Sequence, residues 1–234
     1  MGLKVKICGI TNLEDAVLAL SFGVDSLGFV FYKRSKRYIP PSGAAVIITE
    51  IHRYSLMPHK EFDRSAEPQG FFAAYTASVP CTGVFVNEDI QKLHSIVERT
   101  GIDIVQLSGN EDMDYINKLD RSVIKKIVKA VRIGSRKDVE TVRVFEDQGI
   151  GILLDAYLAK HIYGGSGLAF DWSIIEDIDV SDKLLAGGIG QDNIKYIRDN
   201  IKPYGVDLSS KVESEPGKKD YDKMRKFFET LNNS

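Results

Sequence analysis

The sequence has few of the residues that build metal clusters or disulfide scaffolds. Its 234 residues include two cysteines, Cys8 and Cys81, and four scattered histidines. Neither cysteine has a second cysteine or a histidine at the spacing typical of a metal site, so we expect reduced thiols and no structural zinc. No signal-peptide pattern follows Met1, and no apolar run is long enough to cross a bilayer. These absences predict a cytoplasmic protein without a membrane partner.

An excess of charge of one sign is also lacking. Lys plus Arg number 31 and Asp plus Glu number 33, which gives a net charge of -2. Without a basic excess or a charged tail, nucleic acid is not an expected partner. The length is sufficient for a large buried core and lies within the range of one α/β barrel.

Short apolar segments alternate with amphipathic segments along the whole chain. Residues 26–31 form a continuous apolar run, as in a strand that is buried on both faces. Strands are expected at 4–8, 26–31, 83–86, 104–107, within 123–131, and at 151–154, 183–186 and 206–208, and helices at 13–22, 42–51, 89–99, 112–119, 136–147, from about 171, and at 192–200 and 220–231. Eight such units predict a single (β/α)8 TIM barrel over residues 1–234, with a doubly wound sheet as the alternative.

One connection, residues 54–79 between the second helix and the third strand, is longer than is usual in a compact domain. This inserted loop contains aromatic residues, among them Phe62 and Phe71. We expect it to cover the bottom of the barrel or to form a subunit contact, and the second possibility allows a homodimer.

Catalytic groups of such a barrel come from the carboxyl ends of its strands and from the loops that follow them. At these positions the sequence has one thiol, one carboxylic acid, one arginine, one amide and two turns. They are Cys8, Asp155, Arg37, Gln106, Gly187, Gly188, Asp207, Ser209 and Ser210. The set suggests proton transfer on a small phosphorylated substrate that also carries a carboxylate.

Each candidate also has a simpler interpretation. Thr11 and Glu14 have the spacing of a capping box, so we expect a helix three or four residues after Cys8 whose dipole favours the thiolate. Cys8 could instead be a small core residue. Asp155 follows an apolar strand, where burial would raise its pKa, or it could pair with a lysine. Arg37 could bind a carboxylate or simply be solvated.

Several segments resemble the phosphoribosylanthranilate isomerase family of tryptophan biosynthesis. The segments are Lys4–Asn12 (KVKICGITN), Gly28–Phe31, Ser35–Ile39, Gly83–Asn87, Val105–Leu107, Leu153–Asp155, Gly164–Gly167, Phe170–Trp172, Ala186–Gly188 and Val206–Ser210. The resemblance implies an Amadori rearrangement of N-(5-phosphoribosyl)anthranilate to the open-chain 1-amino-1-deoxyribulose 5-phosphate product. It implies no metal and no cofactor.

The resemblance also implies roles for the candidate residues. Asp155 would be the general acid, Cys8 the general base, and Arg37 the ligand of the anthranilate carboxylate. The turns at Gly187 and Gly188 and at Ser209 and Ser210 would bind the phosphate. Asp207 would lie near the anthranilate, and Gln106 would also contact the substrate.

Two positions depart from the family pattern. Ser108 replaces a histidine and Lys211 replaces a glycine, and if that glycine needs a positive φ the turn must be altered. Three other readings therefore stay open: another phosphate-binding barrel, such as a lyase or an epimerase, an isomerase for a related aminoaldose, and a non-catalytic binding protein.

Overall fold

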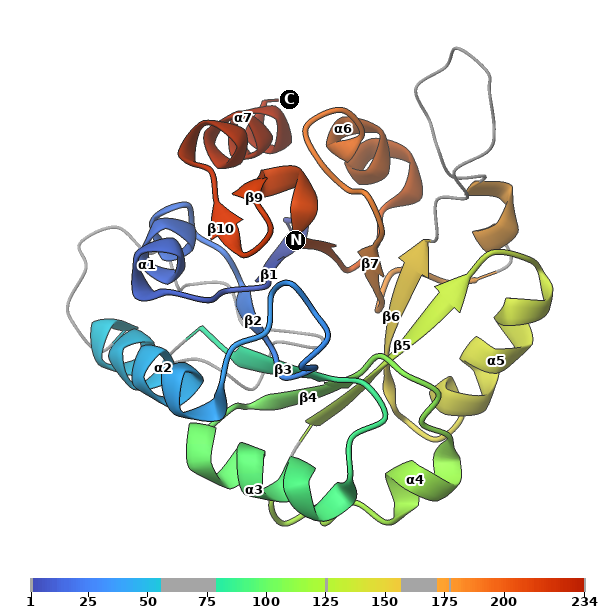
Figure 1. The fold of residues 1–234 in the computed structure, drawn as a ribbon. Coiled ribbons are helices and arrows are strands. Elements are labelled where there is room, and N and C mark those ends of the chain that lie inside the picture. The colour runs from blue at the N-terminus through green and yellow to red at the C-terminus, as the bar shows by residue number, and fades with distance from the viewer. Residues whose placement is uncertain (1, 56–78, 125, 157–171, 177, 234) are drawn as a thin grey trace.

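The computed structural model describes residues 2–55, 79–124, 126–156, 172–176 and 178–233, in which eight parallel strands close into a barrel (Figure 1). Each strand pairs with the next one in the chain, and the last strand pairs with the first. The strands are β1 (Lys4–Cys8), β2 (Ser26–Val30), β3 (Cys81–Phe85), β4 (Ile104–Leu107), β5 (Lys126–Ile133), β6 (Gly151–Ala156), β7 (Leu184–Ala186) and β8 (Gly205–Leu208). The predicted TIM barrel is therefore confirmed.

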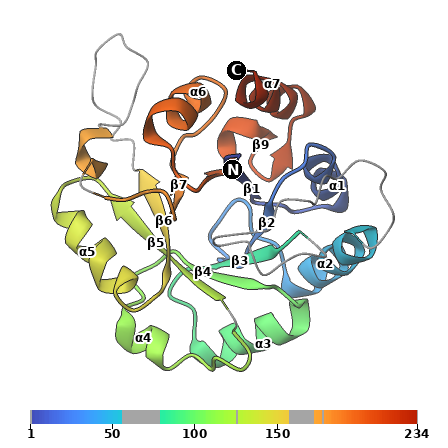
Figure 2. The same ribbon diagram turned by 180° about the vertical axis from the view of Figure 1, so that it is seen from behind.

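Helices surround the barrel, as the view from behind also shows (Figure 2). They are α1 (Leu13–Ser21), α2 (Pro41–Ser55), α3 (Ile90–Thr100), α4 (Met113–Asn117), α5 (Lys137–Glu146), the 3-10 helix η1 (Trp172–Ile175), α6 (Ile194–Tyr196), the π-helix η2 (Ile197–Ile201), the 3-10 helix η3 (Ser210–Val212) and α7 (Tyr221–Asn232). A small antiparallel hairpin, β9 (Glu213–Glu215) and β10 (Lys218–Lys219), lies between η3 and α7.

Several elements differ from the sequence prediction, among them the helix expected from about residue 171, which is the four-residue 3-10 helix η1. α2 continues to Ser55, and most of the expected insertion, residues 56–78, lies outside the described residues. The expected helix 192–200 is divided into α6 and η2, because the Lys202 N–H donates to the Ile197 carbonyl at 2.8 Å, a five-residue span. The β9–β10 hairpin was not predicted, because its charged sequence has no apolar alternation.

The pleat of β1 determines what lies inside the barrel. Val5 and Ile7 pack in the main core that joins strands to helices, whereas Lys6 and Cys8 point to the barrel interior. Across the interior, residues of β4 to β7 form a separate apolar cluster: Ile104, Val128, Leu153, Leu184 and Ala186. The interior is thus apolar on one side and polar beside β1, where the candidate base lies.

Candidate active site

Cys8 is the last residue of β1 and is buried beside Val30 and Val84 at the carboxyl end of the barrel. Gly28 on the neighbouring strand makes room for its sulfur. A Cβ on Gly28 would lie 2.7 Å from Cys8 Sγ, closer than van der Waals contact allows. The absence of a side chain at position 28 therefore permits the thiol to occupy this position.

The helix after Cys8 begins slightly later than the capping-box prediction, and its cap is a different residue. α1 begins at Leu13, one residue after its cap, and the cap is Asn12, whose Oδ1 accepts a hydrogen bond from the Asp15 N–H at 2.8 Å. The Thr11 hydroxyl instead donates to the Gly217 carbonyl at 2.5 Å. The helix therefore begins later than the capping-box pattern suggested. Two lysines also place positive charge near Cys8.

Lys6 and Lys219 are the two lysines near the thiol, and both are buried. Burial has the largest effect on the pKa of Cys8 and raises it. The positive charge of Lys6 lowers this pKa, the negative charge of Asp207 raises it, and Lys219 lowers it. The net pKa lies above the ordinary value of 9.0. The surroundings of Cys8 therefore do not give the predicted preference for the thiolate.

A buried polar network connects three strands below the thiol. Lys6 Nζ donates to Gln106 Oε1 at 2.7 Å and to Asp207 Oδ2 at 2.9 Å. Gln106 Nε2 in turn donates to Ser108 Oγ at 3.1 Å, at the position where the resemblance predicts histidine. Gln106 and Asp207 are thus brought together by Lys6, a residue that the sequence prediction did not include.

Asp155 lies near the carboxyl end of β6. Burial raises its pKa, as predicted, while Arg132 on β5 opposes the rise and Asp207 adds to it. Asp207 also acts electrostatically on Cys8. The candidate acid and the candidate base therefore lie around the same mouth of the barrel, with Asp207 close to both.

Arg37 is held by a carboxylate rather than free in solvent. Its Nε donates to Glu213 Oε1 and Oε2 at 2.9 and 3.0 Å, and its Nη2 donates to Oε2 at 2.6 Å. Lys219 Nζ donates to Glu213 Oε1 at 2.8 Å and to the Cys8 carbonyl at 2.6 Å. This chain of contacts fixes Arg37 beside Cys8. Sequence reasoning missed Lys219 and the pairing role of Glu213, because both belong to the unpredicted hairpin.

The two predicted phosphate-binding turns have suitable backbone and side-chain groups. Gly187 and Gly188 both have positive φ, 100° and 67°, which bulkier residues rarely adopt. The Asn193 amide holds this turn, accepting from the Gly190 N–H at 3.0 Å and donating to the Gly188 carbonyl at 3.2 Å. In the other turn, Ser209 Oγ is buried and bonded to no described residue, which leaves it available to a ligand.

The Lys211 departure does not strain the second turn. Positive φ among the described non-glycine residues occurs at Asn87 and Lys202 but not at Lys211, which lies in η3. A Cβ on Gly190 would lie 2.9 Å from Lys211 Cβ, so the lysine stem packs against the first turn. Ser210 precedes it and is exposed.

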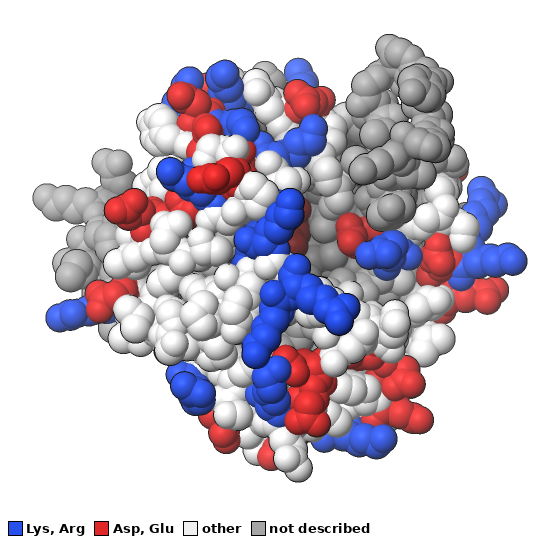
Figure 3. Space-filling model, in the orientation of Figure 1, with Lys and Arg blue, Asp and Glu red and all other residues white. Residues whose placement is uncertain are grey.

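The mouth of the barrel is positively charged. Lys and Arg side chains gather near the centre of the face in Figure 3, over the barrel. Exposed basic residues in the loop after β2 and in the segment after β8 include Lys33, Arg34, Lys36 and Lys211. Such a surface attracts an anionic substrate and raises its rate of encounter.

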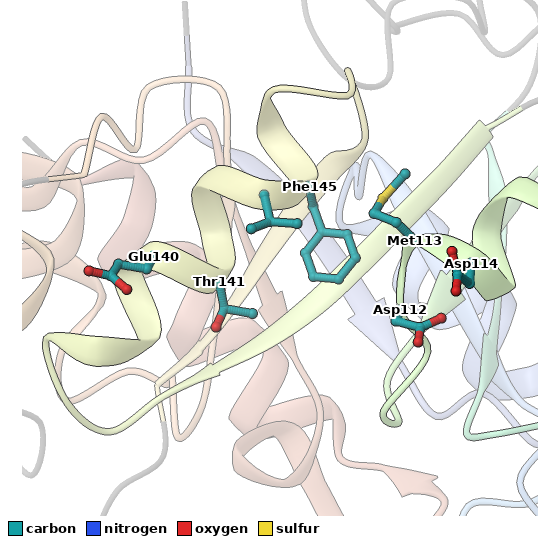
Figure 4. Close-up of a pocket in the computed structure, with 7 residues that line it drawn as sticks. Asp112, Met113, Asp114, Glu140, Thr141 and Phe145 are labelled. Carbon is teal, nitrogen blue, oxygen red and sulfur yellow. The ribbon is translucent and has the colours of Figure 1, made fainter.

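A separate pocket lies on the outside of the barrel, between α4 and α5 (Figure 4). Three of its residues are acidic (Asp112, Asp114 and Glu140), and none is a predicted site residue. Its negative charge does not suit a substrate with a phosphate and a carboxylate, so it is not the candidate active site.

Cys81 lies at the opposite end of the barrel from Cys8, at the start of β3. Its sulfur and one possible ligand atom each of His52 and Asp103 lie within 4.8 Å of one another, a grouping that sequence spacing did not reveal. The Cys81 N–H donates to Asp103 Oδ2 at 2.8 Å. Burial, and then Asp103, raise the pKa of Cys81 well above 9.0. Because Cys81 lies at the opposite end of the barrel from Asp155, it is no candidate for the base.

Comparison with known proteins decides the family. The profile of the family described as N-(5'phosphoribosyl)anthranilate (PRA) isomerase matches residues 62–230. The chain belongs to this isomerase family. It is 37% identical over 229 residues to the N-(5'-phosphoribosyl)anthranilate isomerase of Thermotoga petrophila, with 96% of each chain covered. The enzyme of Geotalea uraniireducens is 38% identical over 226 residues, with 96% of each chain covered.

Solved structures of phosphoribosylanthranilate isomerases have the same fold. The crystal structure of the Thermotoga maritima enzyme superposes with a TM-score of 0.75 at 36% identity, and 98% of each chain is covered. Another isomerase structure, in complex with reduced 1-(o-carboxyphenylamino)-1-deoxyribulose 5-phosphate, has a TM-score of 0.74 at 34% identity and the same coverage.

Membership of the phosphoribosylanthranilate isomerase family confirms the predicted enzyme class. The chain is an isomerase of tryptophan biosynthesis that acts on a small phosphorylated molecule. The family assignment therefore favours the isomerase function over the lyase, epimerase and binding-protein alternatives. Within the described residues, no helix is both long and apolar enough to cross a membrane.

Proposed function

We propose that Asp155 and Cys8 are the acid and the base of an Amadori rearrangement in this barrel. Asp155 protonates the furanose ring oxygen, and the ring C–O bond breaks as the nitrogen lone pair forms a C=N bond. The Cys8 thiolate then removes the C2 proton, and the C–H electrons form the enolamine. Protonation at C1 and loss of the C2 hydroxyl proton give the ketone. The raised pKa of Asp155 supports this role, because it increases the protonated fraction.

The order in which Asp155 and Cys8 titrate limits the fraction of enzyme molecules that have the productive protonation state. The Cys8 pKa is raised from 9.0, and the Asp155 pKa is raised from 3.8, so the acid titrates below the base. The productive form, with a protonated carboxyl and a thiolate, is therefore a minor species whose population is constant between the two pKa values. Its population falls below the pKa of Asp155 and above that of Cys8.

We propose that Arg37, Gln106 and Asp207 bind the anthranilate end of the substrate. Glu213 occupies Nε and Nη2 of Arg37, and no described residue bonds Nη1, which supports its role as a carboxylate ligand. Gln106 and Asp207 share the Lys6 ammonium, and Asp207 Oδ1 is buried without a partner among the described residues. A substrate amine or hydroxyl would satisfy this oxygen.

The phosphate is assigned to the turns after β7 and β8. Gly187 and Gly188 allow backbone N–H groups to approach an anion closely, as in the phosphate sites common in TIM barrels. The Ser209 hydroxyl supports this role because it is buried and has no partner among the described residues. Ser210, at the start of η3, is the other ligand proposed for this turn.

The observation that carries this proposal is the position of Cys8 at the barrel mouth, near Asp207 and close to two buried lysines. Its test is turnover of phosphoribosylanthranilate, followed by the loss of anthranilate fluorescence, in Cys8→Ser. We expect nearly all activity to be lost while affinity for the reduced product analogue is retained. Cys81→Ser, which changes the other buried thiol, is the matched control and should keep full activity. Full activity of Cys8→Ser would refute the base assignment.

We also propose that the protein is a cytoplasmic homodimer. A structure of generated monomers of a dimeric isomerase from Thermotoga maritima is 33% identical to the chain, with a TM-score of 0.74. Light scattering should give twice the chain mass of 26.1 kDa. A mass of one chain at micromolar concentration would contradict the dimer.

A further inference from the structure

Lys6 is a deeply buried charged residue of the candidate site. Its side chain is 1% exposed. Its ammonium is hydrogen-bonded to the carboxylate of Asp207 and to the amide oxygen of Gln106. A lysine is seldom buried so completely, because removing its charge from water is costly unless partners compensate. Burial lowers the pKa of Lys6, but Asp207 and Cys8 together raise it above its ordinary value of 10.5. The group is therefore an ammonium at neutral pH.

Lys6 and Cys8 are two residues apart on β1, so their side chains point to the same side of the strand. The ammonium lies in the barrel interior, held by Gln106 and Asp207, and acts electrostatically on the thiol. We propose that Lys6 is a positioning residue for this reaction, whose buried ammonium favours the thiolate form of Cys8 and holds Asp207 and Gln106 in place for the substrate. This inference rests on the proposed role of Cys8 as base.

The other charges that face Cys8 cannot replace Lys6. Lys219 comes from β10 and Arg37 from the loop after β2, and both are paired with the carboxylate of Glu213. Asp207 from β8 acts in the opposite direction and disfavours the thiolate. Loss of the Lys6 charge would therefore remove one favourable interaction and also leave the Asp207 carboxylate uncompensated close to the sulfur.

The proposal predicts two linked changes in Lys6→Met. The alkaline break in the pH profile of kcat/KM, which reports Cys8, should move upward. The plateau between the two breaks should fall by the same factor, because the thiolate fraction falls about tenfold for each unit of change in the thiol pKa. We expect a fall of roughly tenfold or more. A residue that only supported the fold would lower kcat/KM without moving the break.

The control is Lys183→Met, the same change at another buried lysine. Lys183 precedes β7, at the opposite end of the barrel from Cys8. Its Nζ contacts Glu146 at 2.5 Å and Asp182 at 2.7 Å. We expect Lys183→Met to lose stability as Lys6→Met does, but to keep the wild-type pH profile. An equal displacement of the break in both variants would overturn the proposal.

A second measurement does not depend on turnover. In a Cys81→Ser background, the rate of iodoacetamide alkylation against pH reports the titration of Cys8 alone. Lys6→Met should move its midpoint upward, and Asp207→Asn should move it downward, because Asp207 opposes the thiolate. If Lys6→Met does not fold, Lys6→Gln, which removes the charge but keeps a hydrogen-bond donor for Asp207, takes its place in the same measurement.

The result that overturns the inference is an unchanged alkylation midpoint in a folded Lys6→Met or Lys6→Gln. A failure of the proposed role of Cys8 as base would give a different result from a failure of the Lys6 inference. If Cys8→Ser kept its turnover while the alkylation midpoint still moved in Lys6→Met, Lys6 would control the thiol but the thiol would not be the base. The two claims are thus tested separately.

Discussion

Glu213 holds the guanidinium of Arg37 through three N–O contacts of 2.6 to 3.0 Å. The Glu213 side chain is 3% exposed, and Lys219 binds it from the other side. Arg37 is therefore presented to the barrel mouth in one orientation. A rigid guanidinium loses less conformational freedom when it binds a carboxylate than a free one does.

Arg37→Ala should weaken substrate binding more than it slows the chemistry. Loss of a charged hydrogen-bonding group costs about 1.5–3 kcal/mol, which corresponds to roughly a 10- to 100-fold rise in KM. Glu213→Gln should give a smaller rise, because Arg37 remains but is less well held. Steady-state kinetics on both variants checks this order. A larger fall in kcat than rise in KM for Arg37→Ala would contradict the assignment.

Ser209→Ala should also act on binding, by removing a hydroxyl from the proposed phosphate turn. We expect KM to rise about 10-fold, with kcat changed much less, because the phosphate is bound equally in the ground state and the transition state. Ser214→Ala, an exposed serine in the nearby hairpin, serves as the control. Inhibition by inorganic phosphate should weaken in Ser209→Ala alone, and equal inhibition of both variants would count against the turn.

Gly28→Ala should displace the Cys8 thiol, since the new methyl group would lie 2.7 Å from the sulfur. The expected result is a large fall in kcat with little change in KM, because the anthranilate and phosphate ligands stay in place. Gly43→Ala is the matched control. Its Cβ would meet its nearest neighbour at 3.4 Å in the first turn of α2, so activity should be unchanged.

Acid should weaken the Glu213 cluster. Burial alone would raise the pKa of Glu213, but hydrogen bonds from Arg37 and Lys219 bring it below its ordinary value of 4.5. A carboxylate with a lowered folded pKa stabilises the protein above its unfolded pKa, and this contribution is lost as the pH falls through the folded value. The free energy of unfolding should therefore differ between wild type and Glu213→Gln at pH 7, and the difference should shrink below about pH 4.5. A constant difference down to pH 3 would contradict this.

The barrel could be predicted from the sequence because its strands are nearly continuous apolar runs, of which residues 26–31 are the clearest example. Cys8, Asp155 and the glycine turn at 187–188 could be predicted from their positions at strand ends. Lys6 could not, since a lysine that alternates with apolar residues in a strand usually faces solvent. It faces inward here because the pleat that buries Val5 and Ile7 against the helices turns residues 6 and 8 to the interior.

The surroundings of Cys8 were the least predictable part of the site. Lys219 reaches the Cys8 carbonyl from a hairpin more than two hundred residues along the chain, whose charged sequence gives no strand signal. The helix start at Leu13 depended on whether Thr11 or Asn12 formed the cap. Thr11 does not cap the helix because its hydroxyl donates a hydrogen bond to the carbonyl of Gly217, in that same hairpin. Long-range contacts of this kind have no local signature.

The most direct test of the account is the steady-state turnover of phosphoribosylanthranilate by Asp155→Asn beside wild type and Asp25→Asn. Asp25 pairs with Lys4 at 2.8 Å, at the other end of the barrel, and so controls for the loss of a structural carboxylate. The account predicts that Asp155→Asn loses nearly all turnover but binds the reduced product analogue with wild-type affinity, while Asp25→Asn remains active. Turnover by Asp155→Asn near the wild-type rate would contradict the assignment of the general acid.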